Sequence, residues 1–139
     1  MRFVFALLIT ALPASAWEFS PVPICTLDHV EDDLAVRVTY DPTTKLYAIT
    51  LTRPQGWPAD PTFSIRFDGG RPLTISTTRH YIDPETISVT DTGFGNVLNG
   101  LQFNTSATAF TATGSATFSL EGAANPVLKF RECATAPVA

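Results

Sequence analysis

The sequence has few of the residues on which enzyme and metal chemistry usually depend. Its 139 residues include only two histidines, His29 and His80, and two cysteines, Cys25 and Cys133. The histidines form no HxH or HExxH pattern and the cysteines form no CxxC pair, so the ligand spacing of a zinc site is absent. The sequence therefore predicts no metal site and no cofactor.

Motifs for nucleotide binding and for covalent hydrolysis are also missing. Neither GxxxxGK[ST] nor GxGxxG occurs, because Gly93-Phe94-Gly95 stops short of both, and there is no GxSxG elbow. We therefore predict no catalytic residue. One alternative stays open, in which His29 or His80 acts with a carboxylate in the active site of a small hydrolase. A sequence cannot exclude it, because the members of a catalytic triad come together only in the folded structure.

Positive charge is sparse. The 9 Lys and Arg residues form no run, which argues against binding to nucleic acid or anionic lipid through clustered cations. Negative charge is more frequent, and Asp28, Glu31, Asp32 and Asp33 are its one local concentration. These four lack the glycine and the repeated alternate carboxylates of a calcium loop, so they predict a solvated turn between two strands.

No apolar run is long enough to cross a membrane. The longest, Phe3 to Leu12, has about half of the roughly 20 residues that a spanning helix needs. It follows Arg2 and precedes Ala14-Ser15-Ala16, which together are typical of a secretory signal peptide over residues 1–16. We expect a mature protein that begins at Trp17, is periplasmic or secreted, and keeps no stable membrane span.

Export changes the interpretation of the two cysteines. In an oxidising compartment Cys25 and Cys133 have only one intramolecular pairing, and they lie near the two ends of the mature chain. A bridge that closes a loop of about a hundred residues stabilises a fold by roughly 4 to 5 kcal/mol in the chain-entropy model. We predict a structural disulfide between them.

Residues 17–139 fit a single β-rich domain. Apolar and polar residues alternate with a period of two, which predicts strands at roughly ten-residue intervals; the segments are 24–30, 34–40, 47–52, 63–67, 73–76, 86–90, 107–112 and 115–120. Two short helices are expected late in the chain, one within 93–103 and one that Asn125-Pro126 opens and Cys133 closes. The pattern predicts a mainly β fold, an antiparallel β-sandwich or a partly open barrel.

Three residues form a candidate binding surface: Trp57, His80 and Tyr81. Trp57 lies in the loop 53–61, which three prolines make stiff, and it could either contact a partner or cap the core. His80 and Tyr81 are a polar and an aromatic residue next to each other, and the sequence indicates no mechanism for them.

Short phrases spread over the mature chain resemble a group of short exported proteins of alphaproteobacteria. The phrases are Trp17-Glu18-Phe19, Cys25-Thr26-Leu27, Arg37-Val38-Thr39-Tyr40-Asp41, Arg66-Phe67-Asp68-Gly69, Leu73-Thr74-Ile75-Ser76-Thr77, Gly93-Phe94-Gly95-Asn96-Val97-Leu98 and Phe130-Arg131-Glu132-Cys133. This resemblance implies export and no particular activity. Some members bear an excinuclease subunit name, a role that a short exported chain without a nucleotide-binding loop cannot support.

The layout of strands, the segment Ser119-Leu120-Glu121-Gly122-Ala123 and a terminal helix ending in Cys133 are also similar to the invasion-associated locus B family. That family's additional cysteines are absent here, so its role is not carried over.

We therefore expect an exported, non-catalytic β-domain that acts by surface binding to a protein, an envelope component or a small ligand. The alternatives are the small periplasmic hydrolase and a structural or adhesive envelope subunit. An exposed sheet edge that accepts a partner's strand would mark the subunit.

Overall fold

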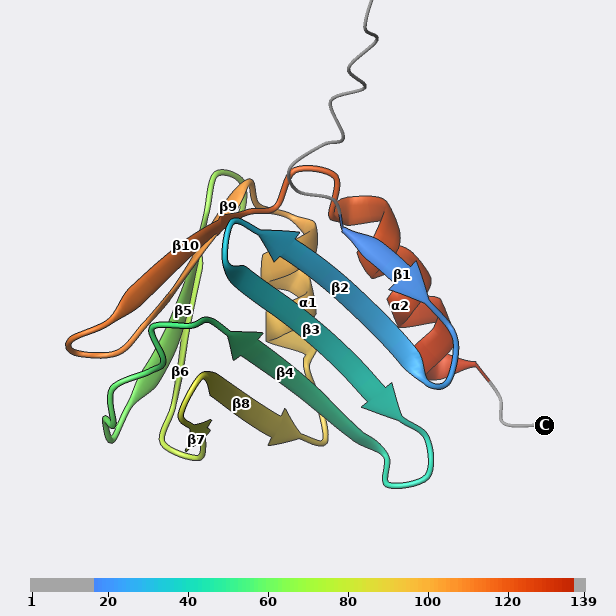
Figure 1. Cartoon of the computed structure of the whole chain (residues 1–139). Helices are drawn as coiled ribbons and strands as arrows, with labels where there is room; N and C mark the ends of the chain where they lie inside the picture. The colour runs from blue at the N-terminus through green and yellow to red at the C-terminus, as the bar shows by residue number, and fades with distance from the viewer. Residues whose placement is uncertain (1–16, 137–139) are drawn as a thin grey trace, which may run out of the picture.

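The computed structural model describes residues 17–136, which form two antiparallel sheets and two helices (Figure 1). The strands are β1 (Glu18–Ser20), β2 (Cys25–Glu31), β3 (Leu34–Asp41), β4 (Leu46–Thr52), β5 (Phe63–Asp68), β6 (Leu73–Thr77), β7 (Tyr81–Asp83), β8 (Thr86–Asp91), β9 (Ser106–Phe110) and β10 (Ser115–Ser119). One sheet has the order β1-β2-β3-β4-β8-β7 and the other β10-β9-β5-β6. Of the two predicted architectures, the sandwich is therefore the one observed. The predicted signal peptide, residues 1–16, lies outside the described residues.

The core lies between the two sheets, and the sequence alternation places residues in it. On the six-stranded sheet Leu27, Val38 and Ile49 are direct cross-strand neighbours, and all three are buried. On the four-stranded sheet the large Phe67 lies opposite the small Ala107. Both are fully buried, so the period-two pattern correctly predicted which face of each sheet is apolar.

Of the two helices, one packs against β1 and β2 of the six-stranded sheet, and the other contacts that helix and β6 of the four-stranded sheet (Figure 1). Helix α1 spans Gly95–Gln102, and Gly100 packs on the ring of Phe67 so closely that an added Cβ would lie 2.4 Å from ring atoms. Helix α2 spans Ala124–Thr135, and the Cys25–Cys133 disulfide joins it to β2. The predicted disulfide is thus confirmed. No helix in the described part of the chain has the length and apolar character needed to cross a membrane.

The start of α2 corrects one sequence prediction. Asn125 is not the N-cap: Ala123 occupies that position and makes no side-chain capping bond, and the helix continues past Cys133. Pro126 then falls in the first turn, where its missing N–H costs nothing because the first N–H groups of a helix have no intrahelical partner. Gly122, at a φ of +76°, ends the preceding turn in a conformation that favours glycine.

Candidate functional site

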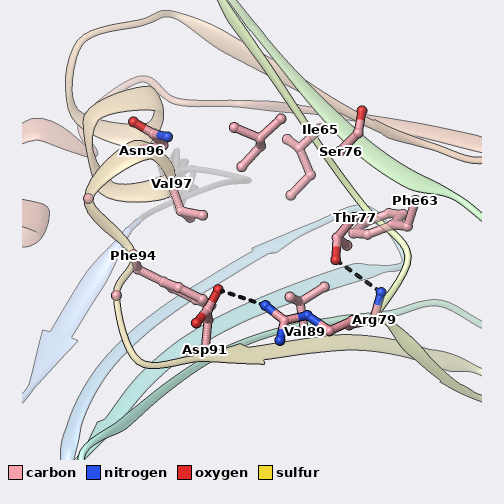
Figure 2. Close-up of a pocket in the computed structure, with 13 residues that line it drawn as sticks. Phe63, Ile65, Ser76, Thr77, Arg79, Val89, Asp91, Phe94, Asn96 and Val97 are labelled. Carbon is pink, nitrogen blue, oxygen red and sulfur yellow. Dashed lines mark hydrogen bonds and ion pairs between the residues drawn. The ribbon is translucent and has the colours of Figure 1, made fainter.

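A cavity of about 500 Å³ lies between the two sheets, next to the start of α1 (Figure 2). Its apolar lining is Phe63, Ile65, Ile75, Val89, Phe94 and Val97, and its polar lining is Ser76, Thr77, Arg79, Asp91 and Asn96, with Gly93 and Gly95 at its edge. Pockets for small molecules typically measure about 300 to 1,000 Å³ and combine an apolar wall with a few polar groups. The cavity has both the size and the composition of a binding site.

The local sequence explains why this space stays open. Strand β8 alternates so that Val89 and Asp91 both point to the core side of the sheet, opposite Ile49 and Tyr47. The chain then crosses to α1 through Gly93-Phe94-Gly95. A Cβ added at Gly93 or Gly95 would meet no atom within 4 Å, so these positions leave room at the cavity edge.

Phe94 holds that crossing segment in place. It is only 4% exposed, and its ring stacks on Tyr47 with centroids 5.5 Å apart and planes 22° apart. Tyr47 in turn packs against Tyr40 on the neighbouring strand, with ring centroids 4.6 Å apart. One wall of the cavity therefore rests on an aromatic cluster and is firmly supported.

One ion pair lies at the rim of the cavity (Figure 2). The guanidinium Nη2 of Arg79 is 3.7 Å from Oδ2 of Asp91, and these side chains are 80% and 44% exposed. The main-chain N–H of Arg79 donates to Oγ1 of Thr77 at 3.0 Å. Exposed ion pairs of this length contribute little to stability, so Arg79 is free to exchange Asp91 for an anionic group of a ligand.

The candidate surface residues predicted from sequence end up in different places. Trp57 is 5% exposed and packs edge-on against Phe63, with ring centroids 6.0 Å apart, while its Nε1 donates to the main-chain oxygen of Leu51 at 3.1 Å. His80 is half-buried and lies 6.0 Å from the same Phe63 ring, and its Nε2 donates to the main-chain oxygen of Asp60 at 2.7 Å. Trp57 and His80 thus pack against Phe63, which lines the cavity. Neither of the two lines the cavity itself. Tyr81 is 68% exposed in strand β7, outside the cavity lining.

His29 lies on the core side of β2 and is 1% exposed. Its ring stacks on Trp17 with centroids 4.5 Å apart and planes 2° apart. Its Nε2 forms a 3.1 Å hydrogen bond with Oε1 of Glu31, which also accepts a bond from the main-chain N–H of Ser119 at 2.9 Å.

Neither His29 nor His80 lines the cavity or bonds to a Ser, Thr or Asp side chain within residues 17–136. In the same range no group of three His, Cys, Asp or Glu side chains is arranged to hold a metal ion.

Burial raises the pKa of Tyr47 above its ordinary value, with a further contribution from Tyr40 and an opposing one from Arg131. The folded state therefore holds this proton more tightly than the unfolded chain does. The resulting stabilisation is complete below the unfolded pKa of about 10 and is lost as pH rises through the folded pKa.

We predict that the wild type loses stability more steeply than Tyr47→Phe as pH rises from about 9 to 11. Urea unfolding at closely spaced pH values measures this difference, and Tyr81→Phe, at an exposed tyrosine, is the control. Parallel curves for the wild type and Tyr47→Phe would contradict the prediction.

The cavity was not predicted from the sequence. Its lining comes from β5, β6, β8 and the segment before α1, and the only local signal was the pair of glycines around Phe94. Comparison with known proteins gives no further guide, since no family model, no curated protein and no solved structure matches this chain.

Proposed function

We propose that this protein is an exported, non-catalytic binding domain, periplasmic or secreted, whose cavity takes an apolar group of a ligand or partner. The observation that carries the proposal is the cavity itself, about 500 Å³ in volume, with six apolar side chains in its lining and the exposed Arg79–Asp91 pair at its rim. An apolar group that contacts the apolar part of this lining would leave water, which favours binding. A charged or polar part of the same ligand would remain at the rim beside Arg79.

The covalent framework supports the exported location. Disulfides persist in secreted and periplasmic proteins and are rare where thiols are kept reduced. The Cys25–Cys133 bond therefore favours the same location as the signal peptide predicted for residues 1–16.

A solvent-sensitive dye with apolar rings and one sulfonate, 1-anilinonaphthalene-8-sulfonate, tests the proposal on the folded, oxidised protein. We expect saturable binding that Gly95→Trp weakens at least tenfold, about 1.4 kcal/mol. Gly95 borders the cavity and is the first residue of α1, and a Cβ there would meet no atom within 4 Å, so an indole can be added at the cavity edge. The matched control is Ala124→Trp, the same new side chain at the exposed first residue of α2.

Equal dye binding by the wild type and both variants would contradict the proposal, because the dye would then bind elsewhere. Turnover in an activity screen that disappears in His29→Gln or His80→Gln would favour the hydrolase instead.

A further inference from the structure

The two edges of the four-stranded sheet are protected very differently. At the β10 edge three main-chain groups are bonded by side chains from other elements. The N–H of Ser119 donates to Glu31 at 2.9 Å, the oxygen of Ser119 accepts from Trp17 at 3.0 Å, and the oxygen of Ser115 accepts from Arg53 at 2.8 Å. These bonds cover both ends of the strand, so the β10 edge is closed to a further strand.

The β6 edge has no such cover. Strand β6 pairs with β5 alone, and within residues 17–136 no main-chain or side-chain group bonds to the N–H and C=O groups on its other side. It also contains no proline, no lysine and no other charged residue, the usual devices that block an edge. A row of unpaired main-chain groups is a template for an added strand.

This free edge borders the cavity (Figure 2). Ile75 and Thr77 belong to the face of β6 that points toward the core, and both line the cavity. Ser76 also lines it, and its hydroxyl is bonded to Oγ of Ser64 at 2.7 Å on the opposite face of the sheet. The edge therefore borders the cavity along residues 75–77, and we call the edge and the cavity together the groove.

Positive charge flanks this groove. Arg71 and Arg79 lie just outside the two ends of β6, and both are exposed. Arg79 has only the 3.7 Å contact with Asp91, and Arg71 lies 4.6 Å over the ring of Phe103 without forming an ion pair within residues 17–136. On a chain with a formal charge of −4, these two cations attract acidic residues to this place.

We propose that the groove binds an extended peptide segment of another protein, which adds as a fifth strand beside β6. Side chains at alternate positions of the peptide are apolar and fill the cavity, and acidic residues at its ends pair with Arg71 and Arg79. In this mode main-chain hydrogen bonds give affinity and the pocket gives specificity. The inference rests on the proposed function of the cavity and names its partner.

Selection of displayed peptides on the mature, oxidised protein gives the first test. We expect enrichment of apolar residues at every second position with Asp or Glu at the ends. A synthetic selected peptide is then N-methylated at one amide at a time. Because successive N–H groups of a strand point to opposite sides, methylation at every second position should weaken binding at least tenfold and the positions between them should tolerate it.

Protein variants locate the peptide. Gly95→Trp should weaken its binding at least tenfold by placing an indole at the cavity edge, and Arg79→Glu at least fivefold by repelling the acidic residues. The matched controls are Ala124→Trp and Lys129→Glu, both at exposed positions of α2, and neither should change the affinity.

The outcomes separate the two proposals. If the dye binds the cavity but no peptide is selected, or if a peptide tolerates N-methylation at every position, the strand-addition proposal is wrong and the binding cavity stands. If neither dye nor peptide binds, both proposals are wrong. A dimer in solution that Ser76→Pro or Ser76→Lys abolishes would show that a second copy occupies the edge, which would overturn the peptide proposal and favour the subunit alternative.

Discussion

Replacing Cys25 and Cys133 together by alanine is expected to lower the free energy of unfolding by about 4 kcal/mol. The bond joins residues separated by 108 positions, and it connects β2 in the six-stranded sheet to the last helix. In the chain-entropy model, a link of this span removes much of the conformational freedom of the unfolded chain. Typical domains have only about 5 to 15 kcal/mol of net stability, so the loss is large.

Urea unfolding of the double variant and of the oxidised wild type measures the difference. Wild type treated with reductant should match the double variant, and reductant should leave the double variant unchanged. A difference below about 1 kcal/mol would contradict the prediction, because the bond would then constrain neither the unfolded chain nor the packing of α2.

The strands could be predicted wherever the alternation is long enough to be recognised. In β3 the residues Leu34, Val36 and Val38 face the core, and this regular pattern extends through both main hairpins. Strands β1 and β7 were not predicted because each has three residues, too few to show a period. Their pairing depends on the neighbouring strands β2 and β8, which a local pattern does not include.

Helix α2 shows the limit of local rules in another way. Asn before Pro is a common start for a helix, yet the structure places Pro126 at the third helical residue. A proline at the first or at the third helical residue costs no intrahelical hydrogen bond, because the N–H groups of the first turn have no intrahelical partner. The preference for proline in the first turn therefore could not distinguish the two helix starts. In the structure the turn that ends at Gly122, which takes a positive φ, comes just before this earlier start.

The candidate site was mostly beyond sequence reasoning for a physical reason. The cavity gathers residues from Phe63 to Val97 that are far apart in the chain, and periodicity says nothing about which elements meet. Trp57 and His80 do lie near the cavity, because both pack on Phe63. Tyr81 is outside the cavity lining, since it begins strand β7 on the outward face, opposite Ser88.

Trp17→Ala is expected to lower the free energy of unfolding by about 3 to 4 kcal/mol. Trp17 is the residue predicted to begin the mature chain, yet it is 6% exposed and stacks in parallel on the buried His29. Its Nε1 also donates to the main-chain oxygen of Ser119 at 3.0 Å, so it joins the opening segment to the edge of the other sheet. Truncation removes the stacking, opens a cavity beside His29 and leaves that oxygen without its partner.

Trp17→Phe separates these contributions in part, because it keeps an aromatic ring against His29 but loses the indole N–H and the volume of the second ring. We expect Trp17→Phe to cost about 1 to 2 kcal/mol in urea unfolding, the sum of one hydrogen bond and a small cavity. Equal losses for the two variants would contradict the assignment of most of the effect to packing. Because Trp17 also covers the β10 edge, both variants should aggregate faster than the wild type, and Val22→Ala, an exposed residue near the same end of the chain, should not.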